Sequence, residues 1–189
     1  MAYIGLAYPI IAKLDESSGS QVYSDGFACG KAIATDITPQ YAEGSLAGDN
    51  AEAEYDKEFK YADVTLNTTA LPVEAHEIMF GHKVTKDQQI SIKDNVKDTP
   101  GFVGMGVYVS EKVNGVKQYV AMWMYKVKFA ESGESYKTKG DNIEYQTPNI
   151  SGRAMGLENG DWRDREIFKT EKEAVDWLKK KANMPAEEA

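Results

Sequence analysis

Two strand-like runs meet at Asn114-Gly115 and predict the central hairpin of the fold. Together they cover Phe102–Phe129 and are rich in Val, Met and aromatic residues. Asn-Gly between such runs favours a type I′ turn, because both central residues of that turn need positive φ. The turn sets the register, and the predicted facing pairs are Tyr108 with Ala121, Gly106 with Trp123, Gly104 with Tyr125, Phe102 with Val127, Val109 with Val120, Val107 with Met122, and Met105 with Met124.

Both faces of this hairpin are apolar, so the sequence predicts that something covers each of them. A sheet with one wet side would alternate apolar with polar positions. The two strand glycines, Gly104 and Gly106, are expected beneath the rings of Tyr125 and Trp123, which can cover the exposed backbone. If the chain itself does not cover both faces, another chain must.

Other short runs extend the β pattern along the chain. We expect strands over Ala7–Leu14, Gln21–Tyr23, Phe27–Thr38, Val84–Ile92, Ile143–Thr147, Asn149–Ala154 and Trp162–Phe168, the last two joined as a hairpin at Asn159-Gly160. Two helices are expected, over Leu71–Gly81 with Thr69 as its cap, and from the capping box of Thr170 and Glu173. The sequence therefore predicts one mainly β domain over residues 1–189, an antiparallel β-sandwich or barrel with two short flanking α-helices.

A polar segment followed by an alternating acidic stretch lies between the early strands and the first helix. Residues 39–50 are small and polar and predict a long loop. Beyond them Glu52, Glu54, Asp56 and Glu58 alternate with mostly apolar positions. Period two predicts a strand with one acidic and one buried face, and a bulge near Ala62-Asp63 explains where the parity changes. The acidic face is either a solvated outer surface or the wall of a channel.

Composition and charge narrow the function classes. The chain has 30 acidic and 22 basic residues, a net charge of −8 and a pI near 4.9. This balance argues against tight nucleic-acid binding, which needs Lys and Arg to neutralise phosphates. A single cysteine excludes a disulfide framework. The N-terminal segment is a poor signal peptide and no run is long enough to span a bilayer, so we expect folding in a reducing cytoplasm and no membrane.

No catalytic set emerges from the motifs. His76-Glu77 and His82 suggest a zinc hydrolase, but the histidines are six residues apart, whereas helical HExxH places them four apart. Cys29 has no surrounding motif. We therefore expect that the protein is not an enzyme and that it binds neither a cofactor nor a metal ion. Recognition, transport or self-assembly remain, and one alternative is a soluble β-sandwich module that binds a ligand or carbohydrate on an aromatic platform of Tyr119, Trp123 and Tyr125.

Three segments of the chain also resemble a known protein family. Its YDKEF at Tyr55–Phe59, FGH at Phe80–His82 and KGDNIEY at Lys139–Tyr145 resemble the major tail protein family of long, non-contractile phage tails. The resemblance is to phages and prophages of Gram-positive bacteria, and it runs from about Ala2 to about Leu178. It carries no catalytic residues.

What the resemblance implies is a virion protein, the tail tube subunit of a siphophage. Such proteins are expected to assemble in the host cytoplasm into homohexameric rings that stack on a tape-measure protein, between tail-tip or baseplate proteins and the tail terminator. The lumen conducts double-stranded DNA, without specific binding, during viral genome ejection.

The resemblance also implies roles for particular residues. The inter-ring loop corresponds to residues 39–50, with Pro39, Tyr41, Gly44, Leu46, Gly48 and Asp49 as candidates. Glu52, Glu54, Asp56 and Glu58 are candidates for the acidic lumen. Phe102, Tyr108, Trp123 and Tyr125 are candidates for the subunit interface, and residues 184–189 are expected to be a flexible tail.

Overall fold

The computed structural model describes residues 2–17, 19–48, 51–131, 133–138 and 146–185. In this part of the chain it contains ten strands and two helices. They are β1 (Ala2–Asp15), β2 (Val22–Ala28), β3 (Ala32–Gly48), β4 (Ala51–Thr68), α1 (Val73–Ile78), β5 (Lys83–Lys86), β6 (Ile90–Lys93), β7 (Phe102–Val113), β8 (Val116–Ala130), β9 (Asn149–Met155), β10 (Arg163–Phe168) and α2 (Glu171–Lys181).

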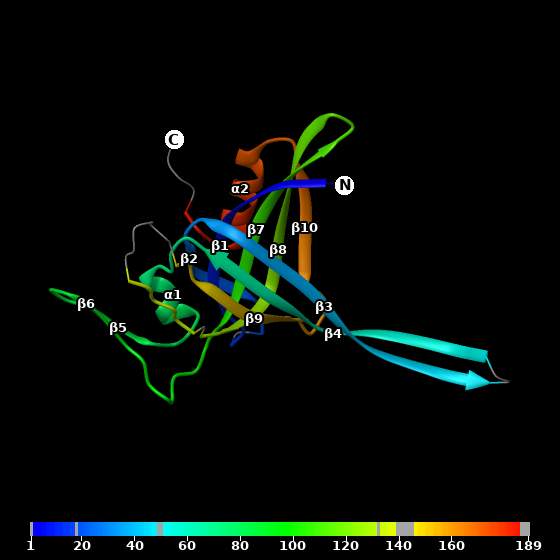
Figure 1. The fold of residues 1–189 in the computed structure, drawn as a ribbon, viewed down its shortest axis with the longest axis horizontal. Helices are drawn as coiled ribbons and strands as arrows, with labels where there is room; N and C mark the ends of the chain where they lie inside the picture. The colour runs from blue at the N-terminus through cyan, green and yellow to red at the C-terminus, as the bar shows by residue number, and fades with distance from the viewer. Residues whose placement is uncertain (1, 18, 49–50, 132, 139–145, 186–189) are drawn as a thin grey trace.

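Eight of these strands form one antiparallel sheet. Its order is β2-β1-β7-β8-β9-β4-β3, and β10 also pairs with β8, while β5 and β6 form a separate small sheet. The large sheet curls, so that β3 at one edge approaches β1 near the other. Helix α1 and the β5–β6 hairpin lie on one side of the molecule, and α2 packs on the central strands (Figure 1). The predicted class, mainly β and antiparallel with two short helices, is confirmed.

The central hairpin has the predicted turn and most of the predicted register. Asn114 and Gly115 both have positive φ, 50° and 85°, as a type I′ turn requires. The expected pairing holds from the turn to Met105 opposite Met124. A bulge in β8 at Tyr125-Lys126, opposite Gly104, then shifts the register, so that Phe102 faces Lys128 rather than Val127. The predicted pairing of Phe102 with Val127 is therefore wrong, and Gly104 lies opposite both Tyr125 and Lys126 instead of Tyr125 alone.

The chain covers both faces of this hairpin itself. On one face, Met105, Val107 and Met124 join the larger core inside the curled sheet. On the other face, Trp123 and Tyr108 pack beneath α2 against Ala174, Leu178 and Ala182, with which they form a second core. The hypothesis that a neighbouring subunit supplies one cover is wrong for the centre of the hairpin, because an amphipathic helix late in the sequence folds back onto it.

Strands β9 and β10 do not form the hairpin that Asn159-Gly160 suggested. The local turn exists, since Gly160 has φ of 88° and its N–H donates to the carbonyl of Leu157 at 3.0 Å. However, β9 pairs with the C-terminal part of β8 and β10 with its N-terminal part, both antiparallel. The two strands lie end to end along the same edge of β8, and the turn lies in the loop that connects them.

The helices follow their local signals to different degrees. α2 has the predicted capping box, in which the Thr170 side chain accepts from the N–H of Glu173 and the Glu173 carboxylate accepts from the N–H of Thr170. α1 is shorter than predicted and begins after Pro72. Thr69 does not cap it, because its hydroxyl accepts from the N–H of Lys31 at 3.1 Å.

The C-terminal end of the described chain differs from the prediction. Met184 was expected to begin a flexible tail, but its side chain packs on the second core and its N–H donates to the carbonyl of Lys179 at 2.9 Å. Residues 186–189 lie outside the described part.

Two predicted strands remain to be placed. The strand predicted over Val84–Ile92 is instead the β5–β6 hairpin, and the strand predicted over Ile143–Thr147 falls mostly on residues that are not described. Among the described residues, no helix is long and apolar enough to cross a membrane.

Candidate functional site: the β3–β4 arm

The segment predicted as a long loop is a strand. β3 continues to Gly48 and pairs with β4 along its whole length, from Ala32 opposite Thr68 to Gly48 opposite Ala51. The outer part of this hairpin, residues 41–48 and 51–59, projects well beyond the body of the molecule (Figure 1). We call it the arm. The loop prediction is wrong because the backbone of the alternating acidic strand needs a hydrogen-bonding partner, and β3 supplies it.

A bulge separates the arm from the body. Gln40 faces Tyr61 and Tyr41 faces Phe59, so Lys60 is left without a partner across the ladder. The parity change predicted near Ala62-Asp63 therefore occurs two to three residues earlier. Beyond the bulge, Ala62, Val64 and Leu66 point into the larger core and are fully buried. The bulge lets one strand serve two environments, the core and the arm.

One face of the arm carries carboxylates without counter-charges. Glu54, Asp56 and Glu58 are all exposed, and no ion pair to them occurs among the described residues. Across the ladder, Asp56 faces Gly44 and Glu58 faces Ala42, neither of which can supply a cation. Of Glu52, only the backbone pairing with Ala47 is described. The carboxylates stand in a row about 7 Å apart, so their mutual repulsion contributes nothing to folding.

The opposite face is aromatic and partly compensated. Tyr41 and Tyr55 are 44% and 54% exposed, which contradicts the prediction that this face is buried within the chain. Lys57 pairs with Glu43 at 2.6 Å and lies 4.6 Å from the ring centre of Tyr41. Their hydrogen bond raises the pKa of Lys57 and lowers the pKa of Glu43. The exposed rings remain available to a partner because the arm extends past anything in this chain that could cover them.

The arm is anchored at its base by stacked rings. Phe59 stacks on Trp162 with ring centres 4.9 Å apart, and Tyr41 meets the edge of Phe59 at 6.1 Å. Trp162 lies in the loop that connects β9 to β10. Pro39 is half-buried where β3 leaves the body, opposite Ala62. Aromatic pairs of this kind are worth about 1 kcal/mol beyond the area they bury, so they hold the base of the arm in one direction.

The remaining arm candidates are placed only in part. Gly44 is exposed. Leu46 pairs through its backbone with Glu54, and Gly48 with Ala51. Asp49 lies outside the described residues.

The four candidate interface residues divide into two buried and two half-buried side chains. Trp123 is fully buried and Tyr108 nearly so. The Tyr108 hydroxyl donates to Glu171 at 2.5 Å, and burial together with this bond raises the pKa of Tyr108. Phe102 and Tyr125 are half-buried. Trp123 and Tyr108 therefore belong to the core beneath α2 rather than to a surface that a neighbouring subunit can reach.

The aromatic platform proposed for ligand binding is not exposed. Trp123 is beneath α2, and Tyr125 is covered in part by Lys181, whose ammonium lies 5.3 Å from the ring centre. The Tyr125 hydroxyl donates to Asp164 at 3.3 Å. A carbohydrate platform needs a flat ring face open to solvent. The burial of Trp123 removes the central ring from this set.

Comparison with models of known protein families and with curated proteins finds no match for this chain.

Proposed function

We propose that this chain is the tube subunit of a long, non-contractile phage tail, which assembles into hexameric rings that stack into a hollow conduit for DNA. The observation that carries the proposal is the arm. A two-stranded ribbon is marginal in water by itself, and this one extends past its own core with two exposed tyrosines. Such a ribbon is explained if a neighbouring copy packs against it in the assembled state.

The arm also supports the ring-to-ring role that the resemblance implies for residues 39–50. A paired hairpin is stiffer than a loop, so it can reach an adjacent ring and dock its aromatic face at a low cost in conformational entropy. The arm and the body are joined by the stacked rings of Phe59 and Trp162. Tyr and Trp are common anchors at protein interfaces.

The uncompensated carboxylates agree with a conduit for DNA. A row of acids repels phosphate, and the absence of facing cations avoids the ion pairs through which DNA would adhere. In the proposed tube, the face of Glu54, Asp56 and Glu58 lines the lumen, with Glu52 as its continuation. The partners of the tube in the virion are then the tape-measure protein, the terminator and the tail-tip proteins.

Negative-stain electron microscopy of the purified protein tests the proposal. Wild-type protein is expected to form rings or long hollow tubes at high concentration. In the matched variant, residues 43–57 are replaced by Asn-Gly, which joins the facing residues Ala42 and Glu58 by a two-residue turn. It is expected to give a folded monomer that forms no tubes. Removing one strand of the arm alone would leave the other unpaired, so both must be shortened together.

Circular dichroism and thermal unfolding of the shortened variant provide the control for folding. A variant with wild-type spectrum and unfolding temperature but no tubes supports the assembly role of the arm. Tubes of normal length from the shortened variant, or wild-type protein that stays monomeric at every concentration, would contradict it.

A further inference from the structure

His82 is buried with a nitrogen that has no hydrogen-bond partner. Its side chain is 4% exposed, directly after Gly81, whose φ of 77° ends the helical segment and turns the chain inward. Its Nδ1 has a carboxylate oxygen of Asp94 at 3.0 Å, but the two atoms do not meet the geometry of a hydrogen bond. A buried nitrogen that makes no hydrogen bond costs stability, so this arrangement calls for an explanation.

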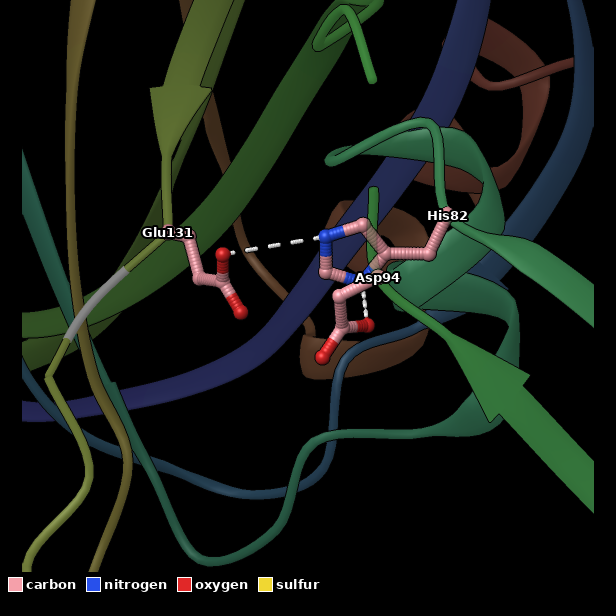
Figure 2. A group of neighbouring side chains, drawn as sticks. All are labelled: His82, Asp94 and Glu131. Carbon is pink, nitrogen blue, oxygen red and sulfur yellow. Dashed lines mark ion pairs between the residues drawn. The ribbon is translucent and has the colours of Figure 1, made fainter. Parts of the chain in front are cut away.

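Two carboxylates converge on this ring from distant parts of the chain. Asp94, directly after β6, has Oδ1 3.0 Å from Nδ1, and Glu131, directly after β8, has Oε2 3.8 Å from Nε2 (Figure 2). One ligand atom from each of the three residues lies within 4.8 Å of the other two. Both carboxylates are more than half exposed, so they can adjust, while the imidazole is held in place.

Asp94 Oδ1 is already close enough to His82 Nδ1 for both atoms to share one ion. Two ligand atoms on a tetrahedral zinc ion with bonds of about 2.1 Å are about 3.4 Å apart, so a small movement of the exposed Asp94 carboxylate from its separation of 3.0 Å would place both atoms on one ion.

The donor set selects a class of ion. One imidazole nitrogen with two carboxylate oxygens suits zinc and neighbouring divalent transition ions, whereas calcium prefers oxygen alone. Three protein ligands leave a further position for water. His76 is not part of this group, although its ring centre is 5.8 Å from that of His82.

We propose that His82 through Nδ1, Asp94 and Glu131 bind a divalent transition-metal ion, with zinc as the first to test. One ion bonds only one ring nitrogen, so the exposed Glu131 carboxylate, now 3.8 Å from Nε2, turns toward the Nδ1 side when the ion binds. The ion joins the end of α1, the β5–β6 hairpin and the end of β8. The β5–β6 hairpin forms its own two-stranded sheet, and most of its residues are exposed, so it has little else to hold it. Metal binding therefore orders this hairpin against the body. The inference stands independently of the proposed function.

The experiment uses untagged full-length protein, because a histidine tag would itself bind zinc. Zinc chloride is titrated into metal-free protein by calorimetry, with manganese and calcium chloride in parallel. We expect one zinc ion per chain, a higher unfolding temperature, and slower hydrogen exchange across residues 83–94. Calcium is expected to bind at least about tenfold more weakly, because it disfavours imidazole.

Three substitutions identify the site. Asp94→Asn and Glu131→Gln change exposed side chains and are expected to fold normally, each weakening zinc binding at least about tenfold, since even outer-shell partners cost about ten- to a hundredfold. Asp87→Asn removes another exposed carboxylate near the turn of the same hairpin and is expected to leave zinc affinity unchanged. Absence of zinc binding by wild type, or unchanged affinity in both site variants, overturns the proposal.

Discussion

The indole of Trp123 lies directly over Gly106, its partner across the β7–β8 ladder. A β-carbon at Gly106 would come within 2.7 Å of the Trp123 ring and within 2.7 Å of the Leu178 side chain on α2. A β-carbon at Gly104 would be 2.3 Å from the same ring. Both strand glycines therefore make room for one tryptophan, whereas the sequence had assigned one of them to Tyr125.

This relationship predicts a specific loss of stability. Gly106→Ala is expected to lower the free energy of unfolding by about 2 kcal/mol, because overpacking in a closed core typically costs 1–3 kcal/mol. Urea unfolding followed by tryptophan fluorescence measures it. Gly44→Ala, at an exposed strand position where the added carbon meets nothing within 4 Å, is the control and should not destabilise the chain. Equal free energies of unfolding for Gly106→Ala and Gly44→Ala would contradict the prediction and would mean that α2 moves to make room for the added carbon.

The contact between α2 and β10 predicts a pH dependence. Lys181 donates to Asp164 at 2.7 Å, and this bond lowers the pKa of Asp164 below its ordinary value of 3.8. A carboxyl with a lowered folded-state pKa contributes stability above its unfolded pKa and loses it as the pH falls through the folded value. Wild type should therefore exceed Asp164→Asn in stability above about pH 5. The difference should shrink as the pH falls below 3.8.

Chemical denaturation of both proteins at a series of pH values measures this difference. The contact is partly exposed, so its contribution is modest and salt reduces it. Asp87→Asn, which has no ion pair among the described residues, is the control and should follow the wild-type curve. A constant offset between wild type and Asp164→Asn from pH 7 to pH 3 would contradict the assignment to this carboxyl.

Cys29 is expected to be unreactive in the folded protein. It is fully buried in the larger core, and burial raises the pKa of its thiol to about 12. Because the thiolate is the reactive form, labelling by a disulfide reagent at pH 8 should be at least about a hundredfold slower in native than in denatured protein. Absorbance of the released thiol gives both rates. Rapid labelling of the native protein would mean that this core opens easily.

The acidic face gives a prediction that depends on the proposed function. Changing Glu52, Glu54, Asp56 and Glu58 to Lys should leave tube formation intact but slow or block DNA release, because phosphates would then bind the wall. Microscopy measures the tubes, and infectivity with DNA release measures the conduit. A charge-matched control changes four exposed acids elsewhere, namely Glu77, Asp87, Glu158 and Glu166. Unchanged ejection in the acidic-face variant places these residues on the outer surface.

Local patterns were sufficient wherever neighbours in sequence determine the structure. The Asn114-Gly115 turn, most of the β7–β8 register and the Thr170 capping box follow from a few adjacent residues. The alternation of Glu54, Asp56 and Glu58 likewise determined an exposed acidic strand. These features need only backbone preferences and the two-residue period of a strand.

Features that depend on contacts between residues far apart in the chain could not be predicted from the sequence. The small polar residues of β3 look like a loop, and only pairing with β4 makes them a strand. The turn at Gly160 is present, yet competition for the edge of β8 decides that β9 and β10 do not pair with each other.

The sequence by itself determined a mainly β chain with a two-faced central hairpin, a single acidic stripe and two short helices. Only the tertiary structure decided that α2 covers Trp123, that the arm projects, and that His82 meets Asp94 and Glu131. The physical reason is the same in each case. Residues far apart in the chain become neighbours only when the sheet curls and pairs, and no local pattern records which distant segment will arrive.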